Sequence, residues 1–248
     1  MRASEPDLPW RVLRTGPGAP AWNMAVDEAL LEAWRPGEAP VLRLYRWAPA
    51  ALSLGRFQPA ADVVAPVGAT LVRRITGGAA IHHRPDEVTY AVVAPYARFG
   101  ARDPRAAYHA VHGALAFALA RLGVALEGEA GRARAPLHGM CFAAATDYDL
   151  VAGGRKLVGS AQRRRGRAFL QHGSLPVSPD PGVPGAVSLA ELVTGPPPDA
   201  AAIEDAIVDA FRERLGGAGD DAMRETETAL AEWLVAARYG DPGWTLER

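Results

Sequence analysis

The 248-residue sequence contains one cysteine and one lysine. A single cysteine excludes an internal disulfide framework and any metal site built from several thiolates, so we expect a reducing compartment and no metal. No apolar run is long enough to span a bilayer, and no N-terminal segment is typical of a signal peptide. We therefore expect a cytoplasmic protein. The net charge of −1 offers no general attraction for nucleic acid or an anionic membrane.

Lysine is scarce although basic residues are not. Of the 27 basic residues, 26 are arginine and the remaining one is Lys156. An ammonium is a compact charge whose pKa responds to its surroundings, whereas a guanidinium stays protonated and spreads its charge. Lys156 and Cys141 share the stretch from His138 to Ser174, which indicates a joint function. The alternative is that Lys156 is an accident of composition and Cys141 a small buried apolar residue.

Length and composition fit one globular unit. Apolar residues make up 49% of the chain and charged residues 22%. We expect a single catalytic domain over residues 1–248, with a core over about 35–225 and C-terminal helices over about 200–240 packed on it. We also expect a monomer.

Strands and helices are mixed along the chain, which predicts an α+β fold. Asn23 is predicted to cap a helix, with Asp27 and Glu28 in its first turns, where the helix dipole favours acids. The predicted helices cover residues 23–34, 104–122, a short turn near 189, 200–215 and 225–239, and Trp244 is expected to fold back onto the core. The predicted strands cover residues 8–14, 41–47 with its neighbour 51–54, and three segments within 70–93.

A meander is predicted in the middle of the chain over residues 147–176, after a polar stretch at 127–137 that is expected to form a mobile loop. Gly153-Gly154 is a two-residue hairpin signal between its first two strands. Arg163 to Arg167, RRRGR, is predicted to form the next turn. This turn is either a solvated loop or a docking patch for an acidic macromolecule.

The glycine pair Gly77-Gly78 allows a sharp turn and a close approach of a ligand to backbone N–H groups. Arg73 and Arg74 precede it and are suited to hold a carboxylate or a phosphate. The alternative is a hairpin turn with two solvated arginines. A metal site at His82-His83 is not expected, because neighbouring side chains on a strand point to opposite faces.

Four blocks then carry a resemblance: SLGRFQ at 53–58, RRITGGAAIHH at 73–83, GRKLVGSAQRR at 154–164 and LQHGS at 170–174. In this order they resemble the superfamily of lipoate-protein ligases, octanoyltransferases and biotin-protein ligases, from Trp10 to Trp244. Cys141-Phe142 and the following YDLVAGGRKLVGSAQ look most like the cysteine-dependent octanoyltransferases. The resemblance implies a mixed, largely antiparallel sheet flanked by helices.

The resemblance also implies a reaction and a site. Such enzymes move octanoyl from acyl carrier protein, through a cysteine thioester, to a lysine of the glycine-cleavage H protein, without a cofactor. The implied catalytic residues are Cys141 and Lys156, fifteen positions apart. The implied acyl-binding residues are Arg74, Thr76, Gly77, Gly78, Ala79, His83, Gly159, Ser160, Ala161, His172 and Gly173.

Within this site, His172 is expected to orient the pocket, and Ile75, Ile81 and Val158 are expected to line an apolar slot. Counting from Gly78 favours His83 over His82 as the family histidine, while counting back from Glu87 leaves the choice open.

Three other functions compete with this one. An ATP-dependent lipoate-protein ligase would need ATP and Mg²⁺, although it would not need a cysteine. An amidotransferase between two lipoyl proteins would use the same thioester, so the donor and the acceptor stay open. A catalytically silent, arginine-rich binding module is the third, and it gives no role to the sole cysteine and the sole lysine.

Overall fold

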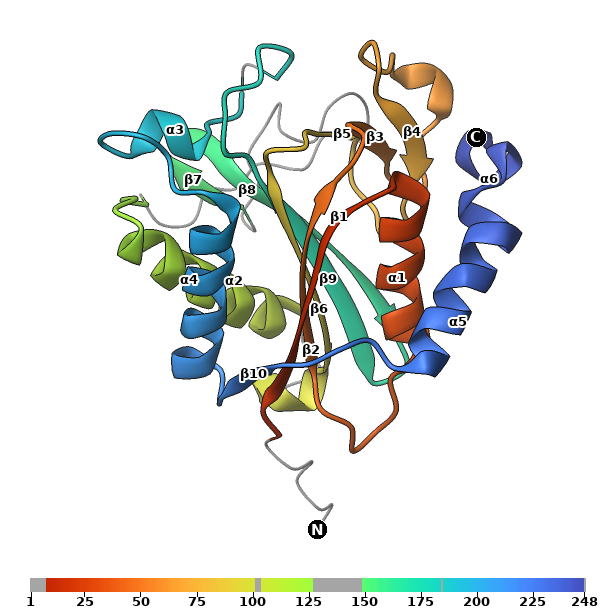
Figure 1. Ribbon diagram of the computed structural model, residues 1–248, viewed down its shortest axis with the longest axis horizontal. Helices are drawn as coiled ribbons and strands as arrows, with labels where there is room; N and C mark the ends of the chain where they lie inside the picture. Colours follow the sequence, from red (N-terminus) through yellow and green to blue (C-terminus); the bar gives the residue numbers. More distant parts are fainter. Residues whose placement is uncertain (1–7, 101–103, 127–148, 184, 248) are drawn as a thin grey trace.

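The computed structural model describes residues 8–100, 104–126, 149–183 and 185–247. A seven-stranded mixed sheet runs through the centre in the order β10-β1-β2-β6-β9-β8-β7 (Figure 1). The pairs β10–β1 and β1–β2 are parallel and the remaining four are antiparallel. Its strands are β1 (Trp10–Gly18), β2 (Val41–Trp47), β6 (Val88–Pro95), β7 (Leu150–Ala152), β8 (Arg155–Arg165), β9 (Ala168–Leu175) and β10 (Ala218–Asp220). The predicted α+β class with a mixed, largely antiparallel sheet is confirmed.

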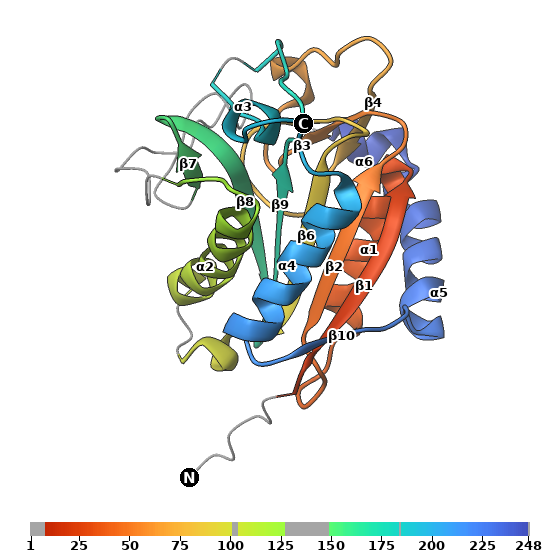
Figure 2. The ribbon, with the colours of Figure 1, turned by 60° about the vertical axis from the view of Figure 1, so that its left-hand side comes forward.

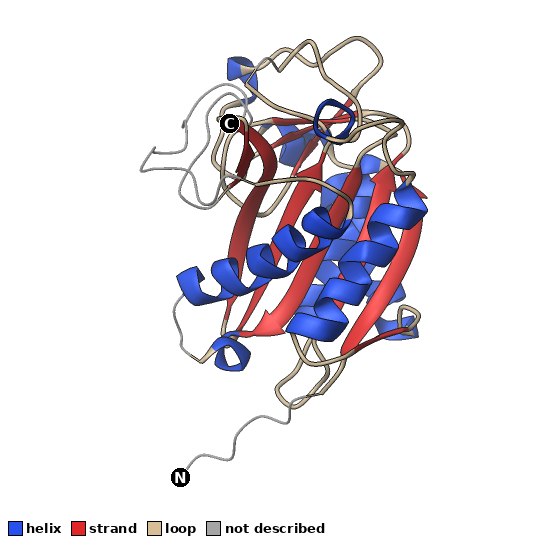
Figure 3. Cartoon of the chain, turned by 90° about the vertical axis from the view of Figure 1, so that its left-hand side faces the viewer, coloured by secondary structure: helices blue, strands red, loops and turns tan. Residues whose placement is uncertain are grey.

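Helices cover both faces of this sheet. Helices α2 and α4 lie together on one face, and α1 and α5 lie on the other (Figures 1 and 2). Figure 3 looks at the face covered by α2 and α4. The helices are α1 (Pro20–Ala33), α2 (Pro104–Arg121), α3 (Leu189–Leu192), α4 (Ala200–Arg214), α5 (Glu225–Leu234) and α6 (Pro242–Leu246), with one π-helical turn η4 (Val235–Tyr239) between the last two.

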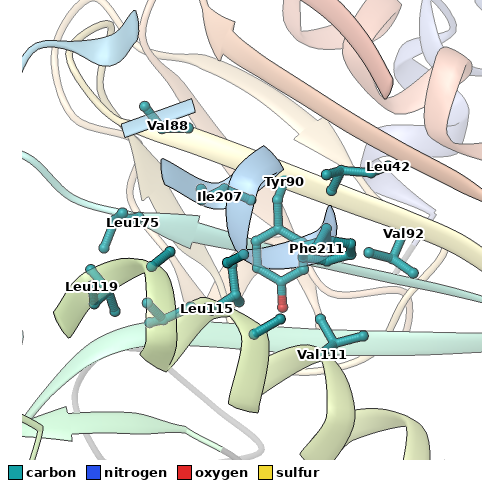
Figure 4. Packing of buried hydrophobic residues seen from close by; sticks show 14 of the residues in the cluster. Leu42, Val88, Tyr90, Val92, Val111, Leu115, Leu119, Leu175, Ile207 and Phe211 are labelled. Carbon is teal, nitrogen blue, oxygen red and sulfur yellow. The ribbon is translucent and has the colours of Figure 1, made fainter. Parts of the chain in front are cut away.

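The larger hydrophobic core lies between the sheet and the pair α2 and α4 (Figure 4). Phe211 of α4 is fully buried there, and its ring meets Trp10 of β1 edge-on at a centroid distance of 5.1 Å. Trp10 also donates through Nε1 to the carbonyl of Leu215. The C-terminal half of the chain is thereby fixed to its first strand.

A second, three-stranded sheet sits at one end of the first, in the order β4-β3-β5 (Figure 1). Its strands are β3 (Ala51–Leu54), β4 (Thr70–Arg73) and β5 (Ile81–His83). Residues 51–54 therefore pair with β4 and β5, and the prediction that they lie beside residues 41–47 is wrong. The short connection 48–50 carries the chain out of the large sheet, so β2 and β3 belong to different sheets.

Two local predictions are also corrected. The first strand continues through Gly18 with an irregularity between Arg14 and Gly16, so the glycines there do not end it. Asn23 lies inside α1, whose N-cap is Ala19. The Asn23 amide is buried and donates to the carbonyls of Gly18 and Arg46, so it joins the helix to two strands.

Other expectations are confirmed. The Gly153-Gly154 hairpin forms with both glycines at positive φ (57° and 70°), the conformation that a type I′ turn requires. Trp244 folds back and donates to the carbonyl of Arg73. The polar stretch 127–137 lies outside the described residues.

The Phe211 contact generates a stability prediction. Phe211→Ala leaves a cavity in the larger core, so we expect the free energy of unfolding to fall by about 3–5 kcal/mol. Chemical denaturation followed by circular dichroism measures the loss. Trp233→Ala is the control, because Trp233 is 60% exposed on α5 and its removal leaves no internal cavity. Equal effects of the two substitutions would contradict the assignment of Phe211 to the core.

Candidate active site

A buried chain of hydrogen bonds links α1 to the glycine turn. Asp27 of α1 accepts a hydrogen bond from Nδ1 of His172 at 2.8 Å. The other ring nitrogen of His172, Nε2, lies 2.6 Å from the hydroxyl of Thr76. The Asp27 carboxylate thus meets one ring nitrogen and the Thr76 hydroxyl meets the other. His172, on β9, is therefore held in one orientation at both nitrogens.

Asp27 holds more than one partner. Arg43 of β2, fully buried, donates to Oδ1 of Asp27 at 2.7 Å, and Tyr45 donates to Oδ2 at 3.0 Å. Burial by itself raises the pKa of Asp27, and the Arg43 charge together with the His172 bond outweighs it, so the pKa lies below its ordinary value. Because α1 begins at Pro20, Asp27 and Glu28 lie beyond its first turn, so the prediction that the helix dipole favours them there is wrong. The Asp27 charge is instead compensated by Arg43.

A second chain of the same kind runs beside the first. Glu87 accepts from Nδ1 of His83 at 2.7 Å, and Nε2 of His83 lies 2.7 Å from the hydroxyl of Ser53. Burial lowers the pKa of His83, so the ring is neutral and accepts from Ser53. Trp47 stacks on the His83 ring at a centroid distance of 3.9 Å.

Both histidines line one cavity of about 280 Å³ between α1, the end of the large sheet and the small sheet. Its walls are formed by Met24, Tyr45, Trp47, Ser53, Arg74, Ile81, His83, Thr89, Ala161, His172, Gly173 and Ser174. Of the residues predicted to bind the acyl group, five are in this wall: Arg74, His83, Ala161, His172 and Gly173. Thr76 is placed next to it by its bond to His172.

The glycine turn at Gly77-Gly78 is held from inside. Arg74 donates to the carbonyls of Gly77 and Ala79, each at 2.8 Å, and to the carbonyl of Ser53. A Cβ on Gly55 would lie 1.8 Å from the carbonyl oxygen of Gly78, so the two loops pack backbone to backbone.

Arg73, fully buried, donates to the carbonyls of Gly55, Gln58 and Thr245. Both arginines are therefore buried and donate to backbone carbonyls in this structure, and the alternative of a hairpin turn with two solvated arginines is wrong.

Strand β8 divides the predicted residues between the two faces of the sheet. Ala161 faces the cavity, whereas the hydroxyl of Ser160 lies on the α2 side, 2.6 Å from Tyr90 Oη and 2.9 Å from His112 Nε2. Burial lowers the pKa of His112 to about 3, with the charges of His109 and Lys156 acting in the same direction. The hydroxyl of Ser160 thus points away from the cavity. Val158 lies on the α2 side as well, in the apolar core.

Lys156 is 2% exposed, and its Nζ lies 3.0 Å from Oδ2 of Asp149, itself 3% exposed. The backbone of Lys156 pairs with the loop before α3, since it donates to the carbonyl of Gly185 and accepts from Val187. Lys156 is absent from the wall of the 280 Å³ cavity. Gly159 lies on β8 between Lys156 and Ala161, and it pairs with Ser174 of β9. Cys141 lies outside the described residues.

Sequence reasoning missed several residues of the site. Asp27, Tyr45, Trp47, Ser53 and Glu87 each contact one of the two histidines or its partner, yet none was predicted to do so. Asp149 lies in the segment YDLVAGGRKLVGSAQ, which carries the family resemblance, but no role was predicted for it. The available signal was the adjacent pair Asp27-Glu28 within the largely apolar stretch NMAVDEALL.

The RRRGR segment is not a simple turn. Arg163 to Arg165 are exposed residues of β8, and only Gly166-Arg167 form the turn. This turn lies at the end of the sheet opposite to β3 and β5 (Figure 1). Arg165 is about 30 Å along the strand from Lys156 at the usual rise per residue.

The described residues contain neither a metal-binding cluster nor a membrane-spanning helix. No group of three or more His, Cys, Asp or Glu side chains in them is arranged to hold a metal ion. His82 and His83 bond to different partners, Asp180 and Glu87. Among the described helices, none has the length and hydropathy to cross a membrane.

Comparison with known proteins identifies the family. Residues 19–212 match the model of the lipoyl protein ligase A/B catalytic domain, and the chain belongs to this family. It is 38% identical to the octanoyltransferase LipM of Kyrpidia tusciae, over 94% of this chain and 97% of the relative. It is 35% identical to the octanoyltransferase LipM of Symbiobacterium thermophilum, over 96% of this chain and 98% of the relative. The predicted enzyme class, an acyltransferase for octanoyl transfer in protein lipoylation, is confirmed.

Solved structures agree on the fold. The proposed lipoate protein ligase Ta0514 of T. acidophilum with bound lipoic acid superposes with a TM-score of 0.84 at 25% identity, over 97% of this chain and all of the other. A lipoate-protein ligase A bound with ATP superposes with a TM-score of 0.83 at 25% identity, over 96% and 99% of the two chains. The predicted lipoate/biotin-ligase fold type is confirmed.

The Asp27 contacts generate a prediction with a defined pH dependence. Asp27→Asn leaves the Arg43 guanidinium buried without its charge partner, so we expect a loss of about 3–5 kcal/mol in the free energy of unfolding at pH 7. Because the folded pKa of Asp27 is depressed, its stabilisation is complete above about pH 4 and disappears as the pH falls through the folded value. The difference between wild type and variant should therefore shrink in acid.

Thermal and urea unfolding between pH 3 and pH 7 measure it. Asp220→Asn is the matched control, since Asp220 is 72% exposed in its pair with Arg14, and such pairs contribute about 0–1 kcal/mol. A pH-independent difference between Asp27→Asn and wild type would show that the ionised carboxylate is not what stabilises this region.

Proposed function

We propose that this protein transfers octanoyl from acyl carrier protein, through a thioester on Cys141, to a lysine of a lipoyl-accepting protein such as the glycine-cleavage H protein. In the first step the Cys141 thiolate attacks the donor thioester and the carrier's thiol leaves. In the second step the acceptor amine attacks the Cys141 thioester and the thiolate leaves. Thioester exchange is nearly balanced and amide formation is downhill, so the proposal needs no ATP, no metal and no other cofactor.

The observation that carries the proposal is the environment of Lys156. It is the only lysine of the chain, and it is buried against Asp149 on a strand that also supplies part of the wall of the 280 Å³ cavity. A buried ion pair has to be held by good geometry, because both charges lose their hydration. An ammonium kept in this way suits a site that favours a thiolate over the thiol, whose ordinary pKa is about 8.5, and that stabilises an oxyanion.

The 280 Å³ cavity is the proposed acyl site. Its described polar side chains bond to one another through the Asp27 and Glu87 chains, so an apolar tail entering it leaves few polar groups unpaired. Ile81 belongs to its wall, as expected for the apolar slot. Ile75 is buried in the core on the α1 side instead. His83, rather than His82, faces this cavity and takes the position of the family histidine in the proposal.

An ATP-dependent ligase is the second candidate, because ligases share the fold at TM-scores of 0.84 and 0.83. Sequence identity favours the transferase: it is 38% with an octanoyltransferase over nearly the full length and 25% with these ligases. The same cavity would serve either enzyme. The donor, not the fold, distinguishes them.

The first functional prediction separates the two candidates. Octanoyl-carrier protein without ATP should modify H protein, and free octanoate or lipoate with ATP and Mg²⁺ should not, because a thioester already holds the activation that an adenylate supplies. Intact-mass spectrometry of H protein under the four donor and nucleotide combinations gives the answer.

Cys141→Ala should abolish the transfer and the hydroxylamine-labile octanoyl adduct on the enzyme. Modification from free acid that depends on ATP and survives in Cys141→Ala would replace the transferase by the ligase.

The second functional prediction concerns Lys156. Lys156→Met keeps an unbranched stem of similar length without the charge, and we expect transfer to fall by at least about 10²-fold because both the thiolate and the oxyanion lose a cation. The pH at which iodoacetamide labels Cys141 should rise.

Arg155→Lys is the control, since Arg155 is a half-exposed neighbour paired with Glu191 at the surface. Unchanged labelling in Lys156→Met, with transfer intact, would remove Lys156 from the chemistry.

A further inference from the structure

A second cavity, of about 390 Å³, lies on the other side of β5. It lies between the connection from β5 to β6 and the segment that follows β9. The side chain of His82 forms part of its wall, whereas its neighbour His83 faces the acyl cavity. Neither the proposed reaction nor the family resemblance gives this cavity a role.

The cavity contains a histidine–carboxylate pair. Nδ1 of His82 donates to Oδ2 of Asp180 at 2.6 Å, and each side chain is only 14% exposed. Nε2 of His82 has no hydrogen bond to any residue that the structure describes. The other charged groups in the wall are Arg84, Asp86 and Glu87. A neutral histidine oriented by a carboxylate at Nδ1 presents a basic nitrogen at Nε2, which is the arrangement of a general base.

The remaining wall indicates what kind of side chain fits. It is largely apolar, with Pro176, Val177, Val183 and Ala186. Three carboxylates against one guanidinium leave the polar part with excess negative charge. The pKa of Asp86 is below its ordinary value, because hydrogen bonding to Ser178 and Arg84 outweighs its partial burial, so this carboxylate is charged. A lysine side chain combines a four-carbon apolar stem with an ammonium, and both parts match this wall.

The two cavities are neighbours. Ile81 of the acyl cavity packs against Val183 and Ala186 of the second cavity. Ala186 also forms a backbone bridge with Lys156. A lysine that enters the second cavity therefore lies next to the acyl cavity and next to the backbone of Lys156.

We propose that this second cavity receives the lysine of the acceptor protein, and that His82, oriented by Asp180, removes the proton from its ammonium. The inference rests on the proposed function. Nε2 of His82 takes one proton, and the neutral amine attacks the carbonyl carbon of the Cys141 thioester. The C–N bond forms and the C–S bond breaks. Of the two hydrogens left on nitrogen, one stays on the amide and the other returns the thiolate to the thiol, while His82 releases its proton to water.

The test separates the two half-reactions. Wild type and His82→Gln are first loaded with octanoyl from octanoyl-carrier protein, and the Cys141 adduct is quantified by intact mass. The loaded enzymes are then mixed with H protein, or with hydroxylamine, whose amine is uncharged at neutral pH. Gln retains a hydrogen bond to Asp180 and cannot act as a base.

We expect equal loading, an equal reaction with hydroxylamine, and transfer to the lysine slower by at least about 10²-fold in His82→Gln at pH 7. The deficit should shrink as the pH approaches the ordinary lysine pKa of about 10.4, where the amine loses its proton unaided. Asp180→Asn should show a smaller deficit of the same kind. Asp209→Asn, an exposed carboxylate on α4 paired with Arg212, should behave as wild type.

Transfer to lysine at the wild-type rate in loaded His82→Gln would overturn the inference. A variant slowed equally toward lysine and hydroxylamine would also overturn it, because the substitution would then have disturbed the thioester site itself. Failure of the wild-type enzyme to form an adduct would instead overturn the proposed function, and this inference with it.

Discussion

The buried carboxylate of Asp27 is the interaction on which the arrangement of this site depends. It compensates the charge of Arg43, accepts from Tyr45, and fixes His172 through Nδ1. Arg43 is completely buried, so its charge is tolerable only while a negative partner remains within contact distance. A helix, a central strand and the strand carrying LQHGS are held to one another by a single ionised group, and the glycine turn is joined to them through Thr76.

Because each histidine is hydrogen-bonded to a carboxylate at one nitrogen and to a hydroxyl at the other, the polar groups around the acyl cavity are occupied with one another. The Glu87–His83–Ser53 chain repeats the pattern of the Asp27 chain on the other wall. Such a network orients side chains but offers little free basicity or acidity. The cavity is therefore suited to hold and shape a substrate, and the activation of a thiol or an amine has to come from groups beside it.

The fold could be predicted largely from periodicity and glycines, since the positions of β2, β6, α2 and the Gly153-Gly154 hairpin follow from patterns within a few residues. Residues 51–54 were misplaced because neighbouring strands in sequence usually pair, and nothing local shows that the chain leaves the sheet. Asn23 and Asp27 were misread for a related reason. A polar residue near a helix start is consistent with capping, and only the partners on β2, Arg46 and Arg43, show that its role is tertiary.

Sequence motifs predicted residues that belong to the site, but they could not predict which face of the sheet each side chain occupies. The block KLVGSAQ is continuous in sequence, yet side chains along β8 alternate, so Ala161 lines the acyl cavity while the hydroxyl of Ser160 joins Tyr90 and His112 behind the sheet. The same alternation on β5 sends His83 to one cavity and His82 to another. The adjacent residues His82 and His83 therefore line two different cavities. Which cavity a motif residue lines is thus decided by the alternation of side chains along the strand and cannot be read from the motif itself.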